Sequence, residues 1–326
     1  MTRVQAPNRL HFGLLSLPVE EFTCWPGLDG ETGLPVRHFG GVGLMIDHPG
    51  LAVRVEPADE WTGEGVVGGR AMALAQRFVN TLPEHEQRPF AVRVEQAPTE
   101  HIGLGVGTQL GLAVVKAVAV ETGHSDWNAV ELARRVGRGE RSAIGVHGFS
   151  SGGLIVEGGK QPGEAISPLV CRVTFPADWA ILLCMPEDSA NWFGIRERQA
   201  FARLSRLAPT PAETETLCRV VLMNMLPALA SGNLEAFGDA LHEFNARVGD
   251  IFAPAQGGRY GSPAIAECVK NLRSAGLRGV GQSSWGPTVF AVVPRAEAAM
   301  RLKEIDTIPA WMAHASPGAE ISHAIP

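Results

Sequence analysis

The sequence is poor in the features that mark several protein classes. It has five cysteines among 326 residues, with no C-x-x-C pair, which argues against a disulfide framework and a zinc ribbon and favours a reducing compartment. Its ten histidines show no H-x-x-x-H or H-E-x-x-H spacing, so we expect no dedicated zinc site and no metal held by the protein alone. There are no internal repeats and no low-complexity segment.

Long apolar runs and an excess of positive charge are also missing. The longest apolar stretch, residues 102–120, is interrupted by Thr108, Gln109 and Lys116, so it has fewer apolar residues than a membrane-spanning helix needs. Residues 1–7 contain no apolar run, and no signal peptide is expected. The formal net charge is −6, whereas sequence-independent nucleic-acid binders are normally basic. We therefore expect a soluble, cytoplasmic protein that binds neither a membrane nor a nucleic acid.

The patterning predicts an α+β protein of two domains, because strands and helices occur in two mixed blocks. A Gly- and Pro-rich stretch near residues 158–168 suggests the boundary, which divides the chain into domains at 1–165 and 166–326. Apolar or alternating runs predict strands at 51–56, 90–95, 154–157, 180–185 and 288–293. Helical periodicity and capping residues predict helices at 71–78, 127–136 (capped by Ser125-Asp126), 213–229, 234–248, 263–275 and 295–303. Residues from 307 on carry little signal.

The feature that points most directly to function is a glycine-rich loop at residues 98–109, Pro-Thr-Glu-His-Ile-Gly-Leu-Gly-Val-Gly-Thr-Gln. An apolar run of helical character follows it directly. Glycine lets a backbone approach a ligand, and a helix that starts after such a loop presents free N–H groups and the positive end of its dipole. The pattern therefore indicates an anion site, typically for phosphate. It is neither a Walker loop nor a dinucleotide fingerprint, since the spacing and the flanking residues differ. Against the acidic background, arginines near glycine-rich segments would supply positive charge: Arg9, Arg37, Arg138 and Arg141.

Three further segments are unlike ordinary scaffold. They read Ala-Pro-Asn-Arg-Leu-His-Phe-Gly-Leu-Leu at 6–15, Arg-Gly-Glu-Arg-Ser-Ala-Ile-Gly at 138–145 and Gly-Val-Gly-Gln-Ser-Ser-Trp-Gly-Pro-Thr at 279–288. With the loop between the first two, this order resembles the GHMP superfamily, which includes galactokinase, homoserine kinase and mevalonate kinase. Within it, the chain most resembles the β-ribofuranosylaminobenzene 5′-phosphate synthase family, over residues 4–293.

The resemblance implies a two-domain GHMP-kinase-like fold, with a ribosomal-S5-domain-2-like N-terminal domain and a ferredoxin-like C-terminal domain. It implies a decarboxylating pentosyltransferase that joins phosphoribosyl pyrophosphate to 4-aminobenzoate or 4-hydroxybenzoate and releases carbon dioxide and pyrophosphate. The product would enter tetrahydromethanopterin biosynthesis. Mg²⁺ would accompany the pyrophosphate, and the protein would form a homodimer.

For this chemistry we assign catalytic roles to Arg9, His11, Asp47 and Arg141. The two arginines would hold the 5-phosphate or the benzoate carboxylate, because a planar guanidinium matches both bidentately. His11 would donate to a substrate anion or take up a proton near neutral pH. Asp47 would replace the aspartate that follows the first motif in archaeal relatives, since this chain continues there as Leu-Ser-Leu-Pro. The expected substrate- and phosphate-binding residues are Gly103, Leu104, Gly105, Val106, Gly107, Thr108, Gln109, Ser142, Ser283, Ser284, Trp285 and Gly286.

Other interpretations stay open at this point. The glycine loop also fits a tight packing turn, and the arginines fit structural ion pairs. His11 also fits a core histidine hydrogen-bonded to the backbone, and Trp285, expected to stack on the aromatic acid, also fits a core position. One rival function is an ATP-dependent small-molecule kinase of the GHMP type. Residues 142–147 lack the aspartate base that many of these kinases use, and Val106-Gly107-Thr108 stands where a metal-binding serine is usual. The other rival is a non-catalytic ligand-binding protein on the same fold.

Overall fold

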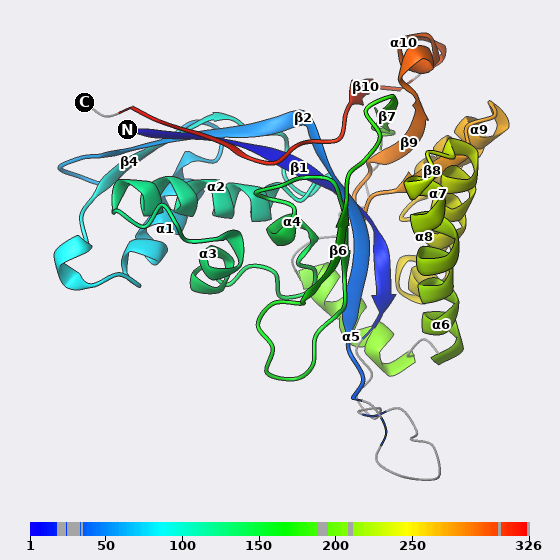
Figure 1. The fold of residues 1–326 in the computed structure, drawn as a ribbon, viewed down its shortest axis with the longest axis horizontal. Helices are drawn as coiled ribbons and strands as arrows, with labels where there is room; N and C mark the ends of the chain where they lie inside the picture. Colours follow the sequence, from blue (N-terminus) through cyan, green and yellow to red (C-terminus); the bar gives the residue numbers. More distant parts are fainter. Residues whose placement is uncertain are drawn as a thin grey trace.

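Two β-sheets with packed helices organise the molecule (Figure 1). The computed structural model describes residues 1–17, 24, 33, 35–187, 195–207, 211–305 and 308–324. Helices and strands are mixed in both halves of the chain, as the α+β prediction requires.

The first sheet is built around two long strands. Its members are β1 (Thr2–Ser16), β2 (Phe39–Pro57), β3 (Thr62–Glu64), β4 (Phe90–Gln96), β5 (Leu154–Glu157), β6 (Leu169–Val173) and β11 (Glu320–His323). The order is β11-β1-β2-β4-β3, and β5, which carries β6, also pairs with β2. At 19 residues, β2 is long enough to pair with β5 near its start and with β4 near its end. Three predicted strands lie within β2, β4 and β5.

Helices α1 to α4 belong to the same half of the chain. They are α1 (Gly68–Val79), α2 (Val106–Glu121), α3 (Ala129–Arg135) and α4 (Ile144–His147), and α1 and α2 lie along one face of the first sheet (Figure 1). The predicted start of α3 is wrong. Asn128, rather than Ser125-Asp126, caps this helix, because its Oδ1 accepts from the backbone N–H groups of Val130 and Glu131, each at 3.0 Å.

The second sheet has the order β10-β7-β9-β8. Its strands are β7 (Trp179–Cys184), β8 (Gly279–Gln282), β9 (Val289–Pro294) and β10 (Ala310–Ala313). Alternate residues of β7 enter different cores, with Leu182 in one and Ile181 and Leu183 in the other. Both faces are therefore buried, which explains why this strand reads as a continuous apolar run.

The helices of the second half follow β7 in the chain. They are α5 (Ile195–Leu207), α6 (Pro211–Val220), α7 (Leu226–Ala230), α8 (Leu234–Gln256), α9 (Pro263–Ser274) and α10 (Arg295–Glu304). The helix predicted at 213–229 is interrupted by a π-helical turn at Val221–Met225. Pro227, which has no N–H to donate to the preceding turn, accounts for the break. The predicted cap of α9 is confirmed, because Ser262 Oγ accepts from the backbone N–H of Ile265 at 3.3 Å.

The C-terminal strands β10 and β11 were not predicted. Each has four residues and is held by pairing with a distant strand, β10 with β7 and β11 with β1. The pairing of β11 places the two ends of the chain side by side (Figure 1). Strands β6 and β11 thus join the first sheet although they follow residue 165.

In the part of the chain that the structure describes, no helix has both the length and the apolar character to cross a bilayer.

Strand β1 positions the residues of the site. It contacts α2 from the first half of the chain and α8 from the second, and its pairing with β2 shifts register between Ala6 and Asn8 and again between His11 and Gly13. Such bulges bend a strand and redirect its side chains. The stretch that carries Arg9 and His11 therefore lies where the two halves of the molecule meet.

Candidate active site

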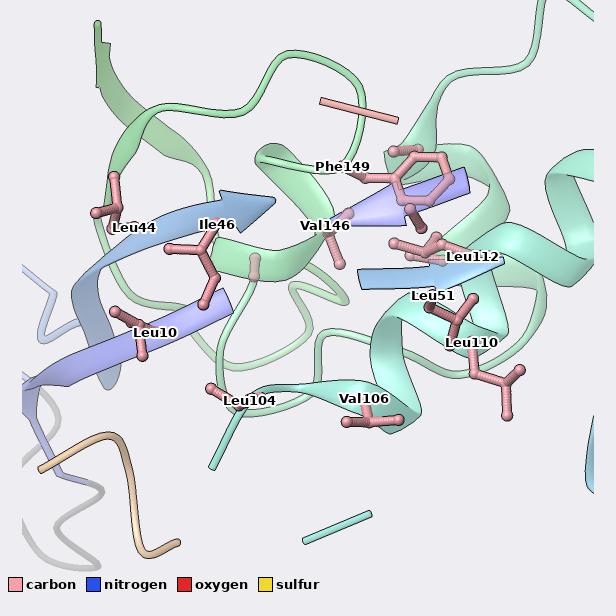
Figure 2. Close-up of a cluster of buried hydrophobic side chains, with 14 of the residues drawn as sticks. Leu10, Leu44, Ile46, Leu51, Leu104, Val106, Leu110, Leu112, Val146 and Phe149 are labelled. Carbon is pink, nitrogen blue, oxygen red and sulfur yellow. The ribbon is translucent and has the colours of Figure 1, made fainter. Parts of the chain in front are cut away.

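The glycine-rich loop is anchored by its alternate apolar residues. Leu104 and Val106 are 0% and 2% exposed, and they lie in the core near Leu10, Ile46 and Leu110 (Figure 2). The glycines that alternate with them, at 103, 105 and 107, line a cavity, which Val106 also borders as predicted. The loop is therefore anchored in the core by Leu104 and Val106 and presents its glycine backbone to a ligand.

Helix α2 begins inside this loop, at Val106, rather than after it. Its N-cap, Gly105, has φ +66°, and a Cβ there would lie 2.5 Å from Cγ of Arg9, so the position requires glycine for both backbone and space. The backbone N–H of Arg9 donates to the carbonyl of Leu104 at 3.1 Å. The first turn of a 16-residue helix and the Arg9 side chain thus lie together, as an anion site requires.

The glycine loop borders a polar cavity of about 350 Å³. Four arginines and two glutamates line it: Arg9, Arg70, Arg138, Arg141, Glu100 and Glu140. Arg70 forms an ion pair with Glu100. Burial, followed by the nearby guanidinium groups of Arg70 and Arg77, lowers the pKa of Arg138 from its usual value. The excess of positive charge around this cavity therefore favours an anionic ligand.

A second, aromatic cavity of about 100 Å³ adjoins the first. Trp285 lies in its wall with its ring centroid 5.0 Å from Phe201 and 5.1 Å from Phe252. The guanidinium carbon of Arg141 lies 4.7 Å from the centre of the Phe201 ring. This cavity can hold a flat aromatic ring with a cation at its edge.

The two cavities share a wall. The residues that line both are Arg9, Arg141, Ser142, Ser284 and Trp285. All five were predicted from the sequence as site residues. An anion in the polar cavity and an aromatic ring in the other would meet at this wall, which is the arrangement that a condensation of two bound molecules requires.

The turn that starts at Ser283 locks the glycine loop to β1. Ser283 Oγ donates to the carbonyl of Gly103 at 2.7 Å and accepts from the backbone N–H of His11 at 3.0 Å. Ser283 is fully buried and lines neither cavity, so it positions the loop and does not face the ligand space. Ser284 is exposed, adopts φ +55° and lines both cavities. Gly286 lines the polar cavity.

Other predicted binding residues have polar groups bound within the protein. Gln109 is buried and lines neither cavity; its Nε2 donates to the carbonyl of Gly145 at 2.8 Å, whereas its Oε1 has no hydrogen-bond partner among the described residues. Ser142 Oγ donates to Glu157 Oε1 at 2.7 Å, and burial raises the pKa of that carboxyl. Leu104 is a core residue. Gly107 and Thr108 line the polar cavity as predicted.

Asp47 is not brought to the site. Its Oδ1 accepts from the backbone N–H of His314 at 2.7 Å, and it lines neither cavity. Arg37 is likewise remote, since it pairs with Glu164. Position in the sequence suggested both residues, and their contacts with His314 and Glu164 hold them away from the two cavities.

His11 is buried beside Arg9 at the edge of the aromatic cavity. It is 6% exposed, and its Nε2 has no hydrogen-bond partner among the described residues. Burial, followed by the positive charge of Arg9, lowers the pKa of His11 well below its usual value. Both effects disfavour the protonated imidazole, so of the two roles predicted for His11 they favour hydrogen bonding by a neutral ring over proton uptake near neutral pH.

The lowered pKa of His11 predicts a loss of stability in mild acid. Above about pH 6.5 His11 is neutral in both the native and the unfolded protein, so it contributes nothing to the pH dependence of the free energy of unfolding. Below it, the unfolded chain binds a proton that the native protein does not, so the free energy of unfolding falls by up to about 1.4 kcal/mol per pH unit. Urea unfolding from pH 7 to 5 should show this slope in the wild type and a shallower one in His11→Gln. Equal slopes, or an NMR titration of His11 near pH 6.5, would contradict the assignment.

Sequence reasoning missed several residues of the aromatic cavity. They are Phe201, Asn245, Phe252, Gln256, Arg259 and Tyr260. Two of these residues could have been noticed in the sequence. Asn245 interrupts the apolar face formed by Leu241 and Val248 on α8, and Tyr260 is the one tyrosine of the chain. Arg70 in the polar cavity carried no signal, because it comes from a different helix, α1, outside the motifs.

Comparison with known proteins identifies the fold. Residues 225–305 match the family described as GHMP kinases C terminal. The structure resembles a putative homoserine kinase from Listeria monocytogenes (TM-score 0.67, 16% identity, 99% of this chain and 100% of that one). It also resembles mevalonate pyrophosphate decarboxylase from Streptococcus pyogenes (TM-score 0.68, 13% identity, 97% of each chain). The chain therefore has the GHMP-kinase fold, as predicted.

Closer relatives identify the family. The chain is 34% identical over 312 residues to beta-ribofuranosylphenol 5'-phosphate synthase from Methanothermobacter thermautotrophicus, covering 89% of this chain and 88% of the relative. It is 31% identical over 313 residues to the protein of the same name from Archaeoglobus fulgidus, covering 90% and 88%. The chain belongs to this family of enzymes, which confirms the family prediction; the kinase and binding-protein alternatives are not favoured.

Proposed function

We propose that this protein condenses phosphoribosyl pyrophosphate with a para-substituted benzoate, releasing carbon dioxide and pyrophosphate, as a step in tetrahydromethanopterin biosynthesis. The observation that carries the proposal is the pair of adjoining cavities with a shared wall of Arg9, Arg141, Ser142, Ser284 and Trp285. The name of the relatives specifies a ribofuranosylphenol product, which favours 4-hydroxybenzoate over 4-aminobenzoate as the acid.

In the proposed reaction the polar cavity binds the phosphorylated ribose. The bond between the anomeric carbon and pyrophosphate breaks, and the N–H groups of the α2 N-terminus with the surrounding arginines stabilise the departing charge. The ring carbon that bears the carboxylate forms the new bond to the anomeric carbon. The bond to carbon dioxide then breaks, and its electron pair restores the aromatic ring. The protein adds and removes no proton in this sequence.

Arg141 and Arg9 have a second role at the shared wall. They hold the benzoate carboxylate next to the anomeric carbon until carbon dioxide leaves. The neutral His11 beside them adds no further positive charge, and its N–H or its lone pair is available to a substrate oxygen.

Mg²⁺ belongs to the proposal as a companion of the pyrophosphate. Among the described residues, no group of three or more His, Cys, Asp or Glu side chains forms a metal centre. The polar cavity offers the carboxylates of Glu100 and Glu140 and the hydroxyl of Thr108. This set fits Mg²⁺, which is usually held by one or two carboxylates together with substrate phosphates. When bound, the ion would neutralise part of the pyrophosphate charge. The homodimer, the cytoplasmic location and the absence of a nucleic-acid partner stay predictions.

The test is a reconstitution assay with carboxyl-labelled acid. Wild-type protein with phosphoribosyl pyrophosphate, Mg²⁺ and 4-hydroxybenzoate or 4-aminobenzoate should release carbon dioxide and pyrophosphate in equal amounts, and a chelator should stop the reaction. ATP with a set of alcohols should give no ADP. Failure to release carbon dioxide with either acid, alongside ATP turnover, would replace the proposal with the kinase function.

A further inference from the structure

Three carboxamide side chains line the aromatic cavity, and two of them are fully engaged within the protein. Asn245 Nδ2 donates to the carbonyls of Phe12 and Gln282 at 2.7 and 2.9 Å, and its Oδ1 accepts from the backbone N–H of Gln282 at 2.9 Å. The Gln282 side chain accepts from the N–H of Gly261 at 3.0 Å and donates to the carbonyl of Gly286 at 3.1 Å. These two amides hold the cavity wall together.

Gln256, the last residue of α8, is different. Its Nε2 donates to the carbonyls of Gly258 and Arg259 at 3.0 and 2.9 Å. These carbonyls require a donor, so they determine which end of the amide is nitrogen. Its Oε1 is buried and accepts no hydrogen bond from any described residue. Buried carbonyl oxygens are normally paired, so this one is available to a donor on a ligand.

The cations and this acceptor belong to different parts of the lining. Arg9 and Arg141 line both cavities, whereas Gln256 lines the aromatic cavity alone. Arg259 adds no open cation to that part, because its Nε and Nη2 donate to the two carboxylate oxygens of Asp250 at 2.8 and 3.0 Å. An aromatic acid in this cavity therefore finds cations on the shared wall and a neutral acceptor outside that wall.

This arrangement matches the geometry of the reaction. The carboxylate must face the shared wall, since the ring carbon that carries it attacks the ribose. The para substituent then points away from the ribose, toward residues that line the aromatic cavity alone, and Gln256 is one of these. We infer that Gln256 recognises this substituent, its Oε1 accepting a hydrogen bond from the para O–H or N–H of the acid. The inference rests on the proposed function and names the group that selects its acceptor.

The hydrogen bond also assists the chemistry. As the ring carbon bonds to the anomeric carbon, electron density moves from the para heteroatom into the ring, and positive charge develops on that heteroatom. A neutral acceptor on its O–H or N–H becomes more strongly bound as this charge grows. The proton stays on the heteroatom, so no base is needed.

The test compares acids that differ in the para group. The intact wild-type protein should bind 4-hydroxybenzoate and 4-aminobenzoate about 10- to 100-fold more tightly than 4-methylbenzoate, which has similar size and no donor, by titration calorimetry. In Gln256→Met this preference should fall below about threefold, while the affinity for phosphoribosyl pyrophosphate stays at the wild-type level. Arg247→Met, an exposed position on the same helix, should keep the full preference.

Three results would overturn the inference: a wild-type protein without the preference, a Gln256→Met variant that retains it, or a variant that also loses phosphoribosyl pyrophosphate binding. The last would show that Gln256 acts only by holding residues 258–259. Since these are binding measurements, they stand apart from the release of carbon dioxide that tests the proposed function. With the two acids that carry a donor, the wild type should also have a higher kcat than Gln256→Met. The two proteins should have equal unfolding midpoints.

Discussion

Arg141→Ala should lower kcat/KM for both substrates by about 30- to 1000-fold, which corresponds to about 2–4 kcal/mol. The guanidinium lies on the wall common to the two cavities and over the Phe201 ring. Its removal therefore takes away a positive charge from the polar cavity, where pyrophosphate binds. It also removes the guanidinium that holds the benzoate carboxylate in the aromatic cavity. Initial-rate kinetics with each substrate varied in turn would measure both effects.

Two further variants separate charge from geometry. Arg141→Lys keeps the charge and loses the planar fork, so its activity should fall between the wild type and Arg141→Ala. Arg134→Ala removes an exposed arginine of α3 that lines neither cavity, and it should behave as wild type. If Arg141→Ala kept an unchanged affinity for phosphoribosyl pyrophosphate and normal turnover, its role as an anion clamp would be wrong.

Gly286→Ala should impair both folding and activity. A Cβ at this position would overlap the backbone of Ile102 and Gly103, where the turn after Ser283 packs directly on the glycine loop. Since backbone atoms cannot move aside as a flexible side chain does, we expect a loss of about 1–3 kcal/mol in the free energy of unfolding. The displaced loop should lose roughly a hundredfold in kcat/KM, because catalysis depends on ångström-scale placement of the bound groups.

Gly69→Ala is the matched control for this change. Gly69 lies in the first turn of α1, and a Cβ there would meet nothing within 4 Å. Alanine favours a helix over glycine by up to about 1 kcal/mol, so this variant should be as stable as the wild type or slightly more stable, with normal activity. Urea unfolding and initial rates would measure both variants. If Gly286→Ala were as stable and as active as Gly69→Ala, the contact between the turn after Ser283 and the glycine loop would not be needed for stability or activity.

Part of this structure can be predicted from local sequence patterns. Local rules of backbone geometry and side-chain periodicity account for four features. These are the alternation of glycines and apolar residues at 103–107, the alternating strands, the apolar face of α8 and the cap of α9. They could be read without knowing which segments meet. The motifs that carry the family resemblance are local in the same sense, and they correctly brought Arg9, Arg141 and Trp285 to one site.

The other features could not be predicted in this way, because they depend on contacts between residues far apart in the chain. The short strands β10 and β11 exist because β7 and β1 offer them edges to pair with. The same kind of pairing places Asp47 against His314 and away from the cavities. Ser283 lies 180 residues from Gly103, so its role as a link between loops has no local signature. The aromatic cavity combines the start of the chain with α5, α8 and the turn at Trp285. Whether Gln256 Oε1 accepts a hydrogen bond depends on which donors the fold brings near it, and none of the described residues supplies one.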